Sequence, residues 1–188
     1  MRRLLDGEFA LTAEITPPVS ADFDELLKRA EPLRKFVDAV TVTDGASARV
    51  HLSSVTSAAI LNANGIEPVV QFTCRDRNRI ALISDLLGVG AHSVHNLLIL
   101  TGDDPTVGDQ PQAKPVFDLK GHELITIAHK MSQHGIIPSK NVRISGEGVD
   151  PNTRKIATPP IFFIGAADVP TIRINEQWLT GLRMKIAC

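Results

Sequence analysis

The chain has 188 residues, of which 43% are hydrophobic and 22% charged, and its formal net charge is −1. A chain of this length and composition is expected to form one domain with a sizeable core, here over residues 1–188. Acidic and basic residues are well mixed, so neither a nucleic acid nor a membrane surface is indicated as a partner. The composition favours a small molecule or another protein.

The cysteine content and the N-terminus predict a reducing, cytoplasmic location. The two cysteines, Cys74 and Cys188, are too few for a disulfide framework, and no secretory signal pattern precedes the first apolar run. No apolar stretch approaches the roughly 18–20 residues that cross a bilayer. We interpret Cys74 as an inert core residue rather than a nucleophile, because a reactive thiol needs a lowered pKa.

Short apolar and β-branched runs recur along the chain, the first four at intervals of about thirty residues, the length of one strand-helix-strand repeat. The five predicted strands are Phe9–Ile15, Val37–Thr43, Pro68–Thr73, Asn96–Thr101 and Ile161–Ala167. Continuously apolar strands are typical of a parallel sheet covered by helices. The pattern predicts an α/β fold without deciding between a doubly wound sheet and a barrel.

Helix-like stretches separate and follow these runs. The predicted helices are Ala21–Phe36, Leu52–Ala63, Arg79–Leu87, Gly121–Gln133 and Glu176–Ala187. Their predicted N-caps are Ser20, Ser53, Asp76 and Asn175, and glycines that mark helix ends are Gly65, Gly90 and Gly135.

Two long connections interrupt this alternation. Asp103–Asp118 follows the fourth strand at its carboxyl end, and Ser139–Pro160, with Gly146-Glu147-Gly148 at its centre, precedes the fifth strand at the opposite end. Loops longer than about 12–15 residues are uncommon in compact domains and are often functional.

Ligands of parallel α/β folds bind at the carboxyl ends of strands, and polar residues gather at those positions here. Glu14 lies between Ala13 and Ile15, where burial would raise its pKa and suit it to act as a general acid. A structural pairing of Glu14 with an arginine is an equal alternative. Gly102-Asp103 by itself favours a turn or a helix cap.

Two further groups of residues have chemistry that could serve binding. Arg75, Arg77 and Arg79 open the third predicted helix, where they could meet a phosphate or carboxylate or could form ion pairs within the protein. The six histidines show neither HxH nor HExxH spacing, so no metal site is predicted.

Six segments, five of them in register on successive strands, resemble one family. They are Ala13–Pro18, Val40–Asp44, Thr73–Arg79, Leu100–Asp103, Lys114–Asp118 and Phe162–Ala167. In this order they resemble methylenetetrahydrofolate reductases, most closely the bacterial and archaeal branch that includes the reductase half of bifunctional homocysteine methyltransferases. The resemblance runs from about Gly7 to the last residue.

The resemblance implies a (β/α)8 TIM barrel that binds FAD at its carboxyl end and uses NADH or NADPH to reduce 5,10-methylenetetrahydrofolate to 5-methyltetrahydrofolate, a step of one-carbon metabolism and methionine biosynthesis. The chain would cover about the first five strand-helix units and lack the C-terminal ones, leaving an incomplete barrel. We therefore also expect either a homo-oligomer or association with a partner subunit. The alternative is a non-catalytic half-barrel that binds flavin or folate.

The resemblance also implies roles for individual residues. Glu14 matches the acid that protonates the folate, and Asp103 matches an aspartate beside the flavin. Positions that match the FAD lining are Thr43, Thr73, Gly102, Asp103, Lys114, Val116, Phe117, Gly165 and Ala166. The enteric form has an arginine and a histidine where this chain has Thr101 and Gln71.

Overall fold

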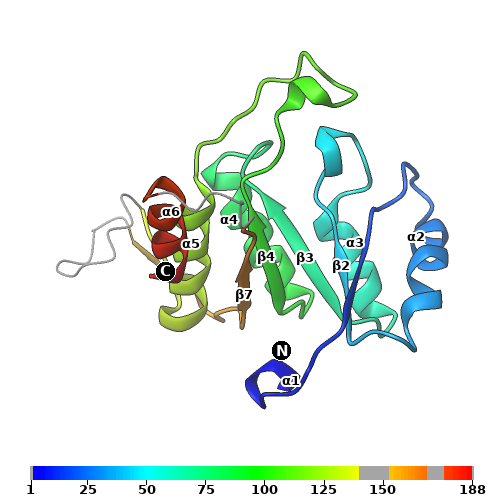
Figure 1. Cartoon of the computed structure of the whole chain (residues 1–188). Helices are drawn as coiled ribbons and strands as arrows, with labels where there is room; N and C mark the ends of the chain where they lie inside the picture. The colour runs from blue at the N-terminus through cyan, green and yellow to red at the C-terminus, as the bar shows by residue number, and fades with distance from the viewer. Residues whose placement is uncertain (1, 140–152, 169–175, 188) are drawn as a thin grey trace.

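The structure, a computed structural model, describes residues 2–139, 153–168 and 176–187 (Figure 1). Its central feature is a five-stranded parallel sheet in the order β1-β2-β3-β4-β7. The strands are β1 (Thr12–Ile15), β2 (Ala39–Val42), β3 (Pro68–Thr73), β4 (Asn96–Leu100) and β7 (Phe163–Ala166). A doubly wound sheet reverses its strand order near the middle, whereas a barrel adds each strand beside the previous one. The unbroken strand order therefore identifies the sheet as part of a barrel.

Helices follow the strands and cover one face of the sheet (Figure 1). They are α2 (Phe23–Ala30), α3 (Ser54–Ala63), α4 (Arg79–Ala91), α5 (Gly121–His134) and α6 (Glu176–Ile186), with α1 (Arg2–Leu5) at the N-terminus. Short 3₁₀ turns are η1 (Glu31–Leu33), η2 (Ala46–Ala48) and η3 (Pro105–Val107). A two-stranded antiparallel pair, β5 (Ile136–Ile137) with β6 (Arg154–Lys155), lies outside the main sheet.

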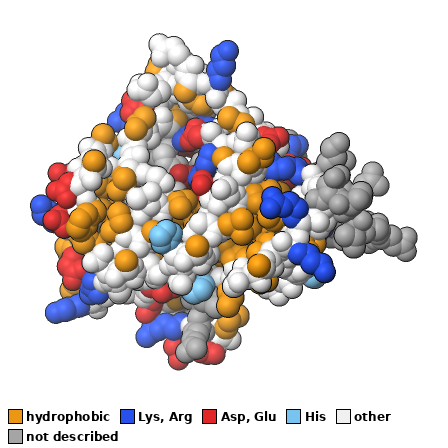
Figure 2. Space-filling model, turned by 180° about the vertical axis from the view of Figure 1, so that it is seen from behind, with side chains coloured by type: hydrophobic (Ala, Val, Ile, Leu, Met, Phe, Trp, Pro, Cys, Tyr) orange, Lys and Arg blue, Asp and Glu red, His pale blue; other side chains and the backbone are white. Residues whose placement is uncertain are grey.

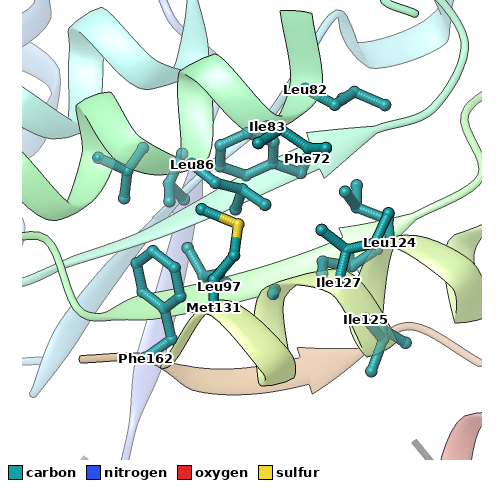
Figure 3. Close-up of a cluster of buried hydrophobic side chains, with 14 of the residues drawn as sticks. Phe72, Leu82, Ile83, Leu86, Leu97, Leu124, Ile125, Ile127, Met131 and Phe162 are labelled. Atoms are coloured by element: carbon teal, nitrogen blue, oxygen red, sulfur yellow. The ribbon is translucent and has the colours of Figure 1, made fainter. Parts of the chain in front are cut away.

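The core lies between the sheet and these helices. Alternate strand residues such as Phe72 and Leu97 point toward the helices, where they meet Leu86 of α4 and Met131 of α5 (Figure 3). A second cluster joins β1 and β2 to α2 and α3 around Leu26. Burial of one apolar face of the sheet fixes the register, because a slip by one residue would turn polar residues toward the helices.

The other face of the sheet would form the interior of a closed barrel. It carries a hollow of about 640 Å³ lined by strand residues that include Thr12, Thr41, Val69 and Leu98. The short helix α1 lines the same hollow through Leu4. Side chains on this face therefore have room for further contacts toward the barrel axis.

Two predicted N-caps are wrong, and one is confirmed. Ser53 caps α3 by accepting a hydrogen bond from the Thr56 amide. Asp22 rather than Ser20 caps α2, and Asn78 rather than Asp76 caps α4, with each cap side chain accepting from the amide of its helix. Neighbouring residues of equal capping ability cannot be ranked by residue type, because the backbone conformation selects among them.

Of the three glycines predicted to mark helix ends, two do so and one does not. Gly135 ends α5 in the left-handed region and Gly65 follows α3 there, as predicted. Gly90 was predicted to end its helix, but α4 continues to Ala91. A Cβ at Gly90 would lie 2.7 Å from Pro160 Cβ, so this glycine instead permits a close approach between segments.

Several element boundaries also differ from prediction. The helix expected over Ala21–Phe36 ends at Ala30, because Pro32 lacks the N–H that would continue the α-helical ladder. The first strand begins at Thr12 rather than Phe9. Neither α1 nor the β5–β6 pair was predicted. Asn175 and Gly146–Gly148 lie outside the described residues, and so does part of the Ser139–Pro160 connection. In the described ranges, no helix has the length and apolarity needed to span a membrane.

Cys74 follows β3 and is fully buried in the core cluster. Burial raises the pKa of its thiol to about 11, although the nearby Arg77 guanidinium opposes the effect. A thiol with a raised pKa remains protonated and unreactive near neutrality. The interpretation of Cys74 as an inert core residue is confirmed.

This burial predicts a pH-dependent stability. The thiol pKa rises from about 9.0 to about 11 on folding, so the folded state binds more protons between these values and its stability falls as pH increases. Two pKa units correspond to a loss of about 2–3 kcal/mol. Urea unfolding across this pH range, in a Cys188→Ser background, should show this extra loss relative to Cys74→Ala. Parallel pH dependences for the two proteins would contradict it.

Candidate active site

A polar pocket of about 300 Å³ opens at the carboxyl ends of the strands. Five of the residues predicted for the site line it together: Glu14, Thr43, Thr73, Gly102 and Asp103. Asp44, Gln71 and Arg75 line it as well. Side chains from four separate strand ends thus converge on one cavity, which is where parallel barrels bind their ligands.

The Asp44 carboxylate organises one wall of this pocket. Its Oδ2 accepts hydrogen bonds from the Thr73 amide at 2.8 Å and from Thr73 Oγ1 at 2.9 Å, and its Oδ1 accepts from Ser54 Oγ at 2.9 Å. Arg77 forms an ion pair with the same carboxylate. One side chain therefore ties the end of β2 to the end of β3 and to the first turn of α3.

The arginines near this wall pair with carboxylates of the protein. Arg77 bridges Asp44 and Asp85, the latter at 2.9 Å, and its guanidinium lies 5.1 Å from the centre of the Phe72 ring. Arg75 is buried, and its hydrogen bond to Asp76 raises its pKa. Arg75 and Arg77 therefore form ion pairs within the protein, which was the predicted alternative to binding a phosphate or carboxylate of a ligand. Charged side chains of both signs gather below the projecting loop in the view from behind (Figure 2).

Glu14 differs from the prediction in its environment. It was expected to be desolvated within an apolar strand, but it is exposed, because β1 is the edge strand of the described sheet and its inner face is open. Its hydrogen-bond partner is also not an arginine. Gln71 donates from Nε2 to Glu14 Oε2 at 2.8 Å.

Thr43 gives the pocket a feature that suits a ligand, and Gly102 allows close packing of the pocket wall. Thr43 is 4% exposed, and its Oγ1 is buried without a hydrogen-bond partner among the described residues. Gly102 has a φ of +99°, and a Cβ there would lie 3.0 Å from Arg75 Cβ and 3.2 Å from Thr73 Cβ. An unpaired buried hydroxyl calls for an explanation, and a ligand that bonds to it is one.

The long loop after β4 projects beyond the carboxyl ends of the strands (Figure 1) and is anchored to the fold. Both Asp109 carboxylate oxygens accept from the Val50 amide, and the Val116 amide donates to Arg75 O at 2.7 Å. Asp118 Oδ2 accepts from the Arg79 amide at 2.8 Å. The loop is therefore positioned as a wall next to the site.

Five of the predicted cofactor residues do not line the carboxyl-end pocket. Lys114, Val116 and Phe117 lie on the anchored loop with exposed side chains, and Phe117 has a φ of +41°. Gly165 lines the hollow of the inner face beside Leu98. The fifth residue outside the pocket lining, Ala166, ends β7 and is exposed.

Sequence reasoning assigned no role to Asp44 or Gln71, although both stand at predicted strand ends. Their partners are distant in sequence, Arg77 for Asp44 and Glu14 for Gln71, so no local spacing marks either pair. Within the described part of the chain, His, Cys, Asp and Glu form no group that could hold a metal ion.

The protein has parallel strand-helix units in chain order and a polar pocket at the strand ends. These features place it in the class of (β/α) barrels, whose ligand sites lie at this end. Residues 1–135 match the family model described as methylenetetrahydrofolate reductase. The chain therefore belongs to the methylenetetrahydrofolate reductase family, a family of TIM-barrel oxidoreductases named for a folate substrate. No curated protein matches the chain.

The Asp44 contacts predict a large effect of a small substitution. Asp44→Asn keeps the side-chain size but removes the charge that pairs with Arg77, and it leaves partly buried donors without an acceptor. We expect the free energy of unfolding to fall by about 2–3 kcal/mol in urea titrations. The exposed Asp6→Asn is the control and should change it by less than about 0.5 kcal/mol. Equal effects would show that Asp44 does not stabilise this wall.

Proposed function

We propose that the protein is a flavin-dependent methylenetetrahydrofolate reductase that uses NADH or NADPH to form 5-methyltetrahydrofolate, in cytoplasmic one-carbon metabolism and methionine biosynthesis. The observation that carries the proposal is the convergence of Glu14, Thr43, Thr73, Gly102 and Asp103 on one pocket. Membership in the family supports the reductase class and the folate substrate.

The residues present fit a flavin. Thr43 Oγ1 offers a buried hydroxyl without a partner among the described residues, and Gly102 packs at the pocket wall, where a Cβ would crowd Arg75 and Thr73. Thr73 Oγ1 donates to Asp44, so toward a ligand it can act as an acceptor. Gly165, Ala166 and the loop residues Lys114, Val116 and Phe117 would complete the FAD site around this pocket. When bound, the flavin supplies the hydride transfer between nicotinamide and folate.

Asp103 would contribute by its charge. It lines the same pocket as Glu14, and its backbone oxygen is within 3.5 Å of Arg75 Nη1. A carboxylate at this place disfavours extra electron density nearby and stabilises a positive charge on the folate. Both effects favour hydride leaving the cofactor side and reaching the one-carbon unit.

Glu14 would supply the proton. In the described structure one carboxyl oxygen, Oε2, accepts from Gln71, and the other can face a substrate. Protonation of a folate nitrogen by Glu14 breaks the bond from that nitrogen to the one-carbon unit and opens the five-membered ring to a cation. That cation is the species that accepts hydride, so the proton and the Asp103 charge act on the same step.

A second candidate function rests on the open inner face. The described sheet carries a hollow of about 640 Å³ and exposes Glu14. A substrate could therefore reach Glu14, but the site lacks the enclosure that excludes water from a reaction. A non-catalytic half-barrel that binds flavin or folate would have these features. Association with a partner subunit or with further copies of the chain would instead cover the open face. Turnover of the isolated chain distinguishes these cases.

The Thr43 hydroxyl predicts opposite effects on stability and on binding. In Thr43→Val the unpartnered hydroxyl is replaced by a methyl group of similar size, so the ligand-free protein should gain about 1 kcal/mol in urea unfolding. FAD affinity should fall about 3- to 10-fold, measured by quenching of flavin fluorescence. Thr43→Ser keeps the hydroxyl and is the control. If Thr43→Val binds FAD as tightly as the wild type, Thr43 does not contact the flavin.

The role of Glu14 predicts a change in one half-reaction. Glu14→Gln cannot donate the proton, so stopped-flow oxidation of the reduced enzyme by methylenetetrahydrofolate should slow by about 100-fold or more. Reduction by NADH or NADPH needs no such proton and should stay within about 2-fold of the wild-type rate. Equal slowing of both half-reactions would contradict the assignment of Glu14 as the acid.

A further inference from the structure

We propose that Gln71 is the positioning residue for Glu14: its side-chain amide reaches across β2 and holds one carboxyl oxygen of Glu14, which leaves the second oxygen for the substrate. The inference rests on the proposed function of Glu14 as the acid. The observation that carries it is the 2.8 Å hydrogen bond from Gln71 Nε2 to Glu14 Oε2.

The strand register explains how two residues on non-adjacent strands meet. Glu14 pairs with Thr41 of β2, and Thr41 pairs with Val69 of β3, two residues before Gln71. Neighbouring strands lie about 4.8 Å apart, so β1 and β3 are separated by about 10 Å, a gap that two long side chains can bridge. In barrels, side chains of one interior layer come from alternate strands. Glu14 and Gln71 form such a contact between alternate strands.

Gln71 is held in place more firmly than Glu14, and this difference indicates which residue positions the other. Gln71 lies on a central strand, is 6% exposed and precedes the fully buried Phe72. Glu14 lies on the edge strand and is exposed. An exposed glutamate without a partner samples several rotamers, and ordering it costs conformational entropy. The buried amide is therefore the anchor, and the carboxyl group is the part that it orients.

The chemistry of the partner suits a group that must exchange a proton. An arginine beside Glu14 would strongly favour the carboxylate, but none of the ion pairs among the described residues involves Glu14. An amide carries both N–H donors and a carbonyl acceptor. Gln71 can donate to the ionised carboxylate and, after its amide turns, accept from the protonated acid. It can thus hold Glu14 before and after proton transfer.

The direct test is NMR of the full chain, which does not depend on activity. Three-bond couplings of the Glu14 side chain report whether it occupies one rotamer. We expect one rotamer in the wild type and averaged couplings in Gln71→Met, which removes the amide at similar length. Gln112→Met, on the exposed loop, is the matched control and should match the wild type. A single rotamer retained in Gln71→Met, or averaging in the wild type, would overturn the proposal.

A second variant and a kinetic measurement separate this role from general stability. Gln71→Asn keeps an amide but shortens the side chain by one methylene, so it should lose the contact as Gln71→Met does. If Gln71→Met folds poorly, Gln71→Asn still tests the proposal. In turnover assays both should lower kcat about 10- to 100-fold with KM for the folate within about 2-fold. Unchanged kcat in a variant with averaged Glu14 couplings overturns the proposal. A wild-type chain without turnover refutes the proposed function instead, and the NMR result still decides the positioning role.

Discussion

The arrangement of the site depends on the Asp44 carboxylate. Asp44 receives hydrogen bonds from Ser54 and Thr73 and an ion pair from Arg77, so it connects two strand ends and the start of a helix. Strand ends in a barrel carry loops that would otherwise move independently. Thr73 is fixed by this contact. Gly102, where a Cβ would lie 3.2 Å from Thr73 Cβ, therefore acquires a defined place too.

The same architecture explains why one face of the sheet is apolar and the other carries polar residues at its carboxyl end. Strand residues that point outward are buried under helices, and Cys74 with its raised pKa belongs to that core. Residues that point inward face the barrel axis, and near the strand ends these are Glu14, Thr43, Gln71 and Thr73. The division follows from the alternation of side chains along each strand. The polar side chains proposed to carry the chemistry therefore gather at one end of one face.

The sequence predicts the elements better than it predicts their contacts. The central strand Pro68–Thr73 was predicted to the residue, because it is a short run rich in β-branched and aromatic residues. The edge strand was predicted too long, and Glu14 was expected to be buried, because the number of neighbouring strands is not encoded locally. The Asp44–Arg77 pair spans 33 residues and leaves no motif. The sequence left two alternatives open. Strand order decided between a barrel and a doubly wound sheet. The carboxylates beside Arg75 and Arg77 decided that these arginines form ion pairs within the protein.

The central claim is that the pocket at the strand ends holds a flavin that passes hydride from a nicotinamide to a folate. The most direct measurement is the visible absorption spectrum of the full chain, loaded with FAD and passed through gel filtration, during anaerobic additions. The account predicts that flavin absorbance elutes with the protein, bleaches on addition of NADH or NADPH, and returns on addition of methylenetetrahydrofolate. Protein that elutes without flavin, or bound flavin that bleaches but does not recover with the folate, would contradict it.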